Sequence, residues 1–201
     1  MKSVLVIVAS YIIGSIPIGY LVATYLKGID ISKYGSGNIG ATNIWRTLGP
    51  VAGTGVFAGD VLKGVVAVTL AKPISPEIVV LAAFAVLAGH SWSVFLGFKG
   101  GKAIATGFGV ILSIAVIPAL IAIPIWGGIV AITGYVSLGS IIAAVSVPIM
   151  MIFLKSPWQY VLTALVLVAI ALYRHKDNIK RLLNGTENRF NTPFVKRRNL
   201  R

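Results

Sequence analysis

The sequence AIATGFGVILSIAVIPALIAIPIWGGIVAITG, residues 103–134, contains no charged side chain. A helix needs about 20 apolar residues to cross a bilayer, because the hydrocarbon core is about 30 Å thick. This stretch is too long for one ordinary span, and Pro118, Pro124 and the pair Gly127-Gly128 interrupt it. It therefore predicts two consecutive membrane helices, over 103–117 and 118–134.

The remainder of the chain has the same apolar character. Of 201 residues, 57% are hydrophobic and 11% are charged, and the mean hydropathy is +0.90. An average soluble domain has about 25% charged residues, so water is not the main solvent of this chain. Further spans are predicted over 4–26, 51–71, 77–96, 136–154 and 158–173.

These spans predict an all-α, polytopic integral membrane protein with about seven transmembrane helices in a single membrane domain, 1–201. Lys2 is followed by an apolar run without a small-residue cleavage site, so we expect the first segment to be retained as a span. A count of five spans with re-entrant pieces remains open. No internal repeat is visible, and the short loops leave no room for a soluble domain.

The charge is strongly positive and unevenly placed. The 18 Lys and Arg against 5 Asp and Glu give a formal charge of +13, which in a soluble protein would suggest nucleic acid. Seven spans place the loops 27–50 and 97–102 and the tail 174–201 on one side. That side carries Lys27, Lys33, Arg46, Lys99, Lys102, Arg174, Lys176, Lys180, Arg181, Arg189, Lys196, Arg197, Arg198 and Arg201. The positive-inside rule then predicts an outer N-terminus and a cytoplasmic C-terminus, with the bilayer rather than nucleic acid as partner.

The loop after the first span reads YGSGNIGATN, residues 34–43. Its glycines permit a close backbone approach, and successive backbone N–H groups can converge on a phosphate at a helix N-terminus near Thr42. Arg46, one turn onward, can add a guanidinium fork for phosphate oxygens. The alternative is a flexible turn whose small polar residues only cap the next helix.

A second polar stretch, GHSWSVFLGFKGGK, covers residues 89–102. Lys99 and Lys102 bracket two glycines at a helix start, which suits a phosphate through point charges and backbone N–H groups. It is not a P-loop, because Ala103 follows Lys102 and the flanks are helical. Two lysines that only mark the membrane boundary are the alternative, which leaves the paired glycines unexplained.

The third polar stretch, RHKDNIKRLLNGTE, covers residues 174–187 directly after the last span. Helical spacing places His175 and Asn178 on one face, where the histidine can exchange a proton and the amide can orient the same hydroxyl. The alternative is a basic helix that binds lipid headgroups. For Glu187 we expect a structural role through ion pairing.

The remaining polar residues do not indicate a cofactor. The chain has no cysteine, no HExxH and no cluster of His and Asp with metal-ligand spacing, so neither a metal nor any other cofactor is predicted. Asp60 and Lys63 lie three residues apart within a span and are expected to pair. The role of His90, in packing or in chemistry, stays open.

Three motifs, in this order, closely resemble the cytoplasmic motifs of the PlsY family. They are SGNIGATN with Arg46 downstream, GHSWSVFLGFKGGKAIAT (89–106) and RHKDNIKRLLNGTE. The resemblance covers essentially the whole chain. It implies a multi-pass enzyme of the bacterial inner membrane with its active site at the cytoplasmic face. The implied reaction transfers a fatty acyl group from acyl-phosphate to the 1-hydroxyl of glycerol 3-phosphate, giving lysophosphatidic acid and phosphate in phospholipid biosynthesis.

The resemblance also implies the roles of individual residues, and it implies no obligate protein partner. The residues implied in catalysis are Ser36, Arg46, Lys102, His175 and Asn178. Those implied in substrate binding are Ser36, Gly37, Asn38, Gly40, Thr42, Asn43, Arg46, Lys99, Gly100, Gly101, Lys102 and Thr106. Glu187 is implied as structural.

Two other functions remain as alternatives. Broken helices and anion-binding loops also build phosphate or organophosphate transporters, although those sites lie near the bilayer midplane, whereas all three motifs here are predicted at one interface. A lipid-binding scaffold would tolerate neutral changes at Ser36 and Gly101. Acyltransferases that use acyl-CoA or acyl carrier protein have a His-x4-Asp pair, and here Phe95 and Lys180 stand five residues after the two histidines.

Overall fold

The computed structural model describes residues 1–190, which form helices joined by turns and contain no strand beyond an isolated bridge between Ser93 and Lys99. The chain divides into two compact units, Met1–Ile114 and the residues from Ala115 on. Each is described by itself. Of the cations used for the predicted topology, Lys196, Arg197, Arg198 and Arg201 lie outside the described residues.

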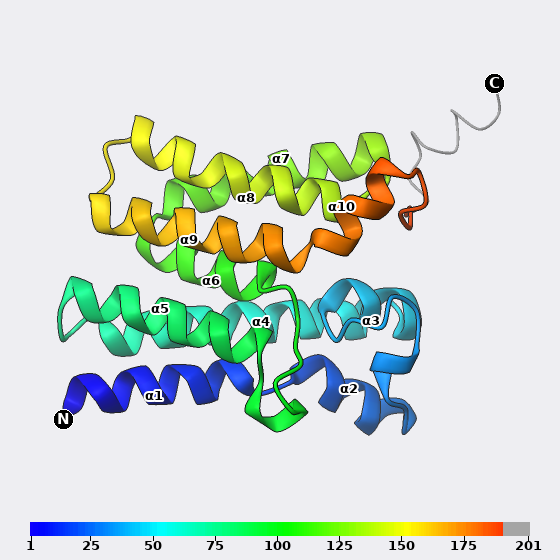
Figure 1. Ribbon diagram of the computed structural model, residues 1–201, viewed down its shortest axis with the longest axis horizontal. Coiled ribbons are helices and arrows are strands. Elements are labelled where there is room, and N and C mark those ends of the chain that lie inside the picture. Colours follow the sequence, from blue (N-terminus) through cyan, green and yellow to red (C-terminus); the bar gives the residue numbers. More distant parts are fainter. Residues whose placement is uncertain (191–201) are drawn as a thin grey trace. The chain divides into compact units, whose positions relative to one another are not determined.

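The first unit contains six α-helices and two short 3-10 turns. Their bounds are α1 Lys2–Ser15, α2 Ile18–Lys27, η1 Ile31–Lys33, α3 Ala41–Leu48, α4 Pro50–Ala71, α5 Pro76–Ser91, η2 Val94–Leu96 and α6 Ile104–Ile114. Helix α1 packs along α5, and α4 packs against α1, α3, α5 and α6, so α4 is the central helix of this unit (Figure 1).

The first predicted span, 4–26, is broken in the structure. Helix α1 ends at Ser15 and α2 begins at Ile18, with Ile16 extended at φ −58° and ψ 113°. The reason is Pro17, which has no N–H to donate and which disfavours the helical conformation of the residue before it. A hydropathy pattern does not register this break, because all the residues around it are apolar.

Close helix crossings in the first unit depend on glycine. A Cβ on Gly14 of α1 would overlap the backbone of Val86 in α5, and a Cβ on Gly89 of α5 would overlap Tyr11 in α1. The same reciprocal arrangement joins α4 and α6, where Gly64 faces Thr106 and Gly109 faces the backbone of Val61. Lipid tails are as apolar as the side chains, so no hydrophobic driving force brings membrane helices together. They associate instead through close packing, which small residues allow.

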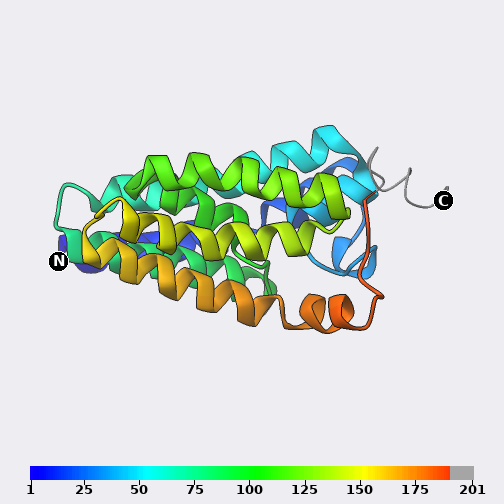
Figure 2. The same ribbon diagram turned by 90° about the horizontal axis from the view of Figure 1, so that it is seen from above.

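The second unit is a helical hairpin extended by a third helix. Its elements are α7 Val116–Thr133, α8 Val136–Phe153, α9 Trp158–Arg174 and α10 Lys176–Leu183. Helices α7, α8 and α9 run side by side in sequence order (Figures 1 and 2), and α10 leaves α9 at a bend of 60°.

The break predicted at 117/118 lies instead at Ala115, between α6 and α7. Pro118 is the third residue of α7, where a backbone N–H would have no partner within the helix, so proline is tolerated there. Pro124 lies inside α7 without ending it.

Each predicted span overlaps an apolar helix, and the chain is an all-helical integral membrane protein. Within residues 1–190, four segments are long and apolar enough to cross a membrane, Lys2–Lys27, Pro50–Ala71, Val116–Thr133 and Val136–Phe153, and the bent pair α9 and α10 makes up to five. Helices α5 and α6 are shorter, and the 11 residues of α6 cover only about 17 Å. The count of seven therefore stays a prediction.

Candidate active site

Asn43 organises the loop of the first motif. Its side chain is buried, and its amide group makes three hydrogen bonds to loop backbone. Oδ1 accepts from the N–H of Ser36 at 2.9 Å, while Nδ2 donates to the carbonyl oxygens of Tyr34 at 3.0 Å and Asn38 at 2.8 Å. Gly35, at φ 57°, passes so close to this amide that a Cβ would overlap Oδ1. The loop is thus held in a fixed shape rather than being a flexible turn.

The fixed loop leads directly into a helix, as predicted. Helix α3 begins at Ala41, and Oδ1 of Asn38 accepts from the N–H of Gly40 at 2.8 Å just before it. Ser36, Gly37 and Arg46 are exposed, whereas Asn38, Gly40 and Thr42 are half-buried. The exposed residues Ser36 and Arg46 thus bring a hydroxyl and a guanidinium to this motif.

The second motif forms a tight loop after α5. The carbonyl oxygen of Ser93 accepts a hydrogen bond from the N–H of Phe98 at 2.8 Å. The N–H of Ser93 donates to the carbonyl oxygen of Lys99 at 3.2 Å. Phe98 and Ala103, at both ends of the Lys99–Lys102 segment, have φ values of 60° and 61°, a region that non-glycine residues rarely occupy. Such strain persists where the surroundings over-determine the backbone, and it concentrates at functional sites.

The paired glycines of this motif have a packing reason. The N–H of Gly101 donates to the carbonyl of His90 at 3.0 Å. A Cβ on Gly101 would overlap the imidazole of His90, and a Cβ on Gly100 would overlap the backbone of His90 and Ser91. The loop therefore lies directly on the last turn of α5, and only glycine fits at both positions. Lys99 on this loop is exposed and Lys102 is half-buried.

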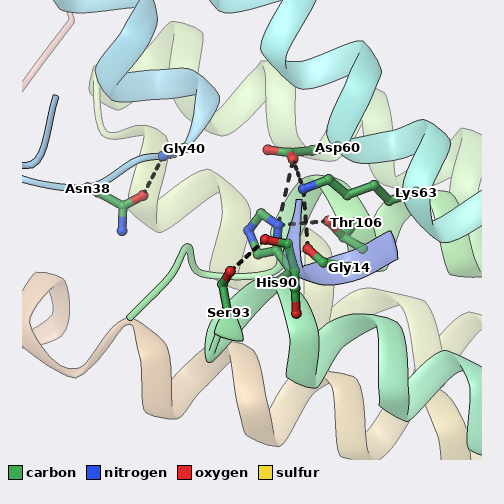
Figure 3. A network of polar contacts seen from close by, with 9 residues as sticks. Gly14, Asn38, Gly40, Asp60, Lys63, His90, Ser93 and Thr106 are labelled. Carbon is green, nitrogen blue, oxygen red and sulfur yellow. Dashed lines mark hydrogen bonds and ion pairs between the residues drawn. The ribbon is translucent and has the colours of Figure 1, made fainter. Parts of the chain in front are cut away.

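A buried polar network lies under this loop (Figure 3). Nζ of Lys63 is 2.8 Å from Oδ1 of Asp60, which is itself 3.6 Å from Nδ1 of His90. The same His90 nitrogen is 3.1 Å from the hydroxyl of Thr106 in α6. The side chains of Asp60, Lys63 and His90 are no more than 5% exposed. The network joins α4, α5 and α6.

This network also completes the broken first helix. In a continuous helix, the carbonyls of Gly14 and Ser15 would accept from the backbone N–H groups of residues 18 and 19. Instead, Nζ of Lys63 donates to the carbonyl oxygen of Gly14 at 3.4 Å. The hydroxyl of Ser93 donates to the carbonyl oxygen of Ser15 at 2.5 Å. Side chains thereby satisfy backbone groups that lipid cannot.

A small pocket brings the first two motifs together within the first unit. Its lining includes Ile39 of the first motif, His90 and Ser93 of the second, and the charged pair Asp60 and Lys63. The break between α1 and α2 supplies the remaining wall, and Gly19 lets Ile39 approach α2 closely. One pocket is therefore lined by residues of both glycine-rich motifs.

The third motif begins at the bend between α9 and α10. His175 is buried, and its Nδ1 lies 2.7 Å from the carbonyl oxygen of Ala171. Because a carbonyl only accepts, Nδ1 carries the proton in the neutral ring, and Nε2 is then the basic nitrogen. Asn178 lies one turn later and is also buried.

Glu187 fastens the segment after α10. Oε1 accepts from the hydroxyl of Ser137 at 2.7 Å and from Nδ2 of Asn178 at 2.6 Å, and Oε2 accepts from Nε of Arg181 at 2.7 Å. Burial raises the pKa of this carboxyl, but the hydrogen bonds from Ser137, Asn178 and Arg181 outweigh it, so the pKa lies below its ordinary value. The geometry supports the structural role expected for Glu187.

Residues after Glu187 attach to the turn between α7 and α8. The N–H of Phe190 donates to the carbonyl of Gly134 at 2.8 Å, and the guanidinium of Arg189 lies 4.6 Å from the centre of the Tyr135 ring. Together with the bond from Glu187 to Ser137, these contacts hold the segment 185–190 against the start of α8.

A sequence profile for a family described as "Glycerol-3-phosphate acyltransferase" matches residues 4–185, nearly the whole chain. The chain belongs to this family. It is 50% identical over 188 residues to a glycerol-3-phosphate acyltransferase of Desulforudis audaxviator, covering 93% of this chain and 95% of that one. It is 51% identical over 189 residues to one of Desulforamulus reducens, covering 93% and 94%.

Solved structures agree with this assignment of the acyltransferase. A crystal structure of PlsY (YgiH), an integral membrane glycerol 3-phosphate acyltransferase in its glycerol 3-phosphate form, has a TM-score of 0.92 and 38% identity, covering 97% of this chain and 98% of that chain. The lysophosphatidic acid form of PlsY has a TM-score of 0.90 with the same identity and coverage. The predicted resemblance is confirmed, and so is the integral membrane fold.

In this acyltransferase, the structure groups the predicted site residues by unit. The first unit holds Ser36, Gly37, Asn38, Gly40, Thr42, Asn43, Arg46, Lys99, Gly100, Gly101, Lys102 and Thr106, and the second holds His175, Asn178 and Glu187. Thr106 is fully buried, with its hydroxyl 3.1 Å from Nδ1 of His90, and its part in substrate binding stays a prediction. Sequence reasoning paired Asp60 with Lys63 from their spacing but did not connect them with His90 or Ser93.

Proposed function

We propose that this glycerol-3-phosphate acyltransferase takes its acyl group from acyl-phosphate. It transfers the group to the 1-hydroxyl of glycerol 3-phosphate and releases lysophosphatidic acid and inorganic phosphate, an early step of phospholipid biosynthesis. The observation that carries this proposal is the match to PlsY over 97% of the chain, in forms with glycerol 3-phosphate and with lysophosphatidic acid. No comparable observation favours a transporter.

The polar residues of the chain suit this donor. Acyltransferases that use acyl-CoA or acyl carrier protein rely on a His-x4-Asp pair, which neither histidine here can form. An acyl-phosphate is a mixed anhydride with a good leaving group, so the enzyme has mainly to position two substrates and stabilise charge. Loops of glycine, lysine and arginine are adapted to that task.

The reaction we propose is a direct displacement. The 1-hydroxyl oxygen of glycerol 3-phosphate attacks the carbonyl carbon of the acyl-phosphate, the bond from that carbon to the phosphate oxygen breaks, and the electron pair leaves with phosphate. The proton of the hydroxyl goes to the leaving phosphate or to Nε2 of His175, the basic nitrogen when Nδ1 donates to Ala171. Asn178 orients the reacting hydroxyl or the imidazole.

The cationic loops bind the two phosphate groups in this proposal. Lys99, Gly100, Gly101 and Lys102 hold the phosphate of glycerol 3-phosphate through ammonium groups and backbone N–H groups. Arg46 and the loop from Ser36 to Asn43 hold the other phosphate, with Ser36 as a hydrogen-bonding group rather than a nucleophile. A covalent acyl group on Ser36, detected by mass spectrometry of protein quenched with labelled donor, would contradict this assignment.

We further propose that the enzyme works in a bacterial inner membrane with its three motifs at the cytoplasmic face, its N-terminus outside and its C-terminus inside. The distribution of Lys and Arg along the chain supports this orientation. The fatty chain of the donor lies among apolar helices at bilayer depth, and no protein partner is required.

Activity with defined substrates tests the donor. Purified protein in detergent receives palmitoyl-phosphate and glycerol 3-phosphate without metal or coenzyme A, and phosphate and lysophosphatidic acid are measured together. We expect equal amounts of both products, and loss of both with Arg46→Ala or Lys102→Ala. Turnover with palmitoyl-coenzyme A or palmitoyl-acyl carrier protein, but not with palmitoyl-phosphate, would contradict the proposed donor.

Topology is tested by labelling single introduced cysteines, which is possible because the chain has no cysteine of its own. Single cysteines at exposed positions Lys27, Lys72, Lys99 and Lys155 are labelled with a membrane-impermeant maleimide in intact and in opened spheroplasts. We expect labelling of Lys72→Cys and Lys155→Cys from outside, and of the other two only after opening. The reverse pattern would overturn the orientation.

A further inference from the structure

A connected polar cluster inside the first unit consists of Asp60, Lys63, His90 and Thr106. Asp60 and Lys63 belong to none of the three motifs; they lie in the middle of α4. A charged pair buried in a membrane helix is costly and is kept where it performs a task. The hydrogen bond from Lys63 to the carbonyl oxygen of Gly14 explains why a lysine stands at position 63, but it does not explain the position of His90.

The imidazole of His90 is held from one side. Its Nδ1 lies 3.1 Å from the hydroxyl of Thr106 and 3.6 Å from Oδ1 of Asp60, on two different helices. Both neighbours are themselves fixed, because Asp60 is paired with Lys63 and Thr106 is fully buried. The ring therefore has a defined orientation about its side-chain bonds.

The other side of the same residue supports the loop that carries Lys102. The Nε2 edge of the ring lies against Gly101, and the carbonyl of His90 accepts the N–H of Gly101 at 3.0 Å. Lys102 is the next residue, and the backbone beyond it is strained at Ala103, with φ 61°. A loop held in a strained conformation requires a rigid support, and His90 is that support.

The geometry points to Asp60, His90 and Thr106 as positioning residues that set the loop of Gly101 and Lys102 for the phosphate of glycerol 3-phosphate. They do not touch the substrate; they act through the orientation of the His90 ring. This inference rests on the proposed function of the loop as the glycerol 3-phosphate site. A displacement of about 1 Å at a binding group is enough to change catalysis about 100-fold, so the support matters as much as the cation it carries.

The first experiment uses matched changes at Thr106. Thr106→Val removes the hydroxyl with little change of shape, Thr106→Ser keeps it, and Ser113→Ala removes a hydroxyl that bonds only its own helix at the carbonyl of Gly109. Initial rates are measured against glycerol 3-phosphate and, separately, against palmitoyl-phosphate. Direct binding of glycerol 3-phosphate is followed by titration calorimetry.

We expect Thr106→Val to raise KM and Kd for glycerol 3-phosphate about tenfold, which is the size of effect that the loss of one well-placed interaction causes. KM for palmitoyl-phosphate should change little. Thr106→Ser and Ser113→Ala should resemble the wild type. Equal changes in KM for both substrates, or a lower Tm with unchanged KM and Kd, would overturn the inference. Calorimetry needs no donor, so absence of turnover with palmitoyl-phosphate in the wild type counts against the donor alone.

A second experiment tests the contact between ring and loop. Gly101→Ala places a methyl group against the His90 ring, and His90→Ala removes that ring. If the ring positions the loop, the two changes are not additive, and Gly101→Ala raises Kd for glycerol 3-phosphate less in the His90→Ala background than in the wild type. Additive effects on Kd would show that the loop finds its position without His90.

Discussion

The side-chain amide of Asn178 donates a hydrogen bond of 2.6 Å to Oε1 of Glu187, and the same oxygen accepts from Ser137 at 2.7 Å. One carboxylate thus joins the helix of the third motif to the start of α8, within the second unit. This bond fixes the side chain of Asn178.

Glu187→Ala should destabilise the protein by about 3 kcal/mol, because it leaves two buried donors and a guanidinium without their acceptor. Thermal unfolding in detergent measures the effect. Glu77→Ala, at an exposed carboxylate in the first turn of α5, is the control and should change the Tm much less. An equal fall in Tm for both variants would show that Glu187 has no special structural role.

Acid should remove the contribution of Glu187. Its folded pKa is lowered because hydrogen bonds from Ser137, Asn178 and Arg181 outweigh the opposing effect of burial. Its stabilising effect is therefore fully present above the ordinary value of 4.5 and is lost as the pH falls through the lowered folded pKa. The difference in Tm between the wild type and Glu187→Gln should be constant near neutral pH and shrink below pH 4.5. A difference that stays the same down to pH 3 would contradict this linkage.

Asn43→Asp should impair the first motif although the side chains have nearly the same shape. The carboxylate still accepts from Ser36, but it cannot donate to the carbonyls of Tyr34 and Asn38, which repel it. We expect a loss of about 2 kcal/mol of stability and at least a tenfold lower kcat/KM. Asn184→Asp, at an exposed helix end, is the control for an added negative charge. Full activity of Asn43→Asp would mean that the loop does not need its backbone bonds.

Gly109→Ala should lower the Tm, because its Cβ would overlap the carbonyl of Val61 where α6 crosses α4. Gly128→Ala is the matched control, since no atom lies within 4 Å of a Cβ at that position in α7. It should be neutral or slightly stabilising, as alanine favours a helix over glycine by about 1 kcal/mol. Equal effects of the two changes would indicate that the close crossing is absent in the membrane.

Long apolar runs predicted the helices well, because lipid permits few alternatives to a helix for an apolar chain. The runs did not predict where helices break. Pro118 was expected to interrupt a helix, yet it lies in the first turn of α7, where its missing N–H costs nothing. Pro17 stands within an unbroken apolar run, where hydropathy gives no sign of a break, and it ends α1. The effect of a proline depends on its distance from a helix start, which hydropathy does not report.

The motifs were identified from the sequence, but the reasons for their residues were not. The glycines of the second motif were attributed to phosphate binding, whereas the structure shows that Gly100 and Gly101 also have to fit on His90. Asp60 and His90 are distant in the sequence, and no pattern of spacing joins them. Contacts of this kind follow from helix packing, and single-sequence periodicity does not contain them.

The break at Pro17 also bears on how the protein is made. The carbonyls of Gly14 and Ser15 are served by Lys63 and Ser93, which follow them in the chain by 49 and 78 residues. During synthesis, α1 is therefore complete in the chain before the side chains that satisfy its last carbonyls have been added. The polar bonds at the end of α1 can form only after α4 and the loop that follows α5 have been synthesised.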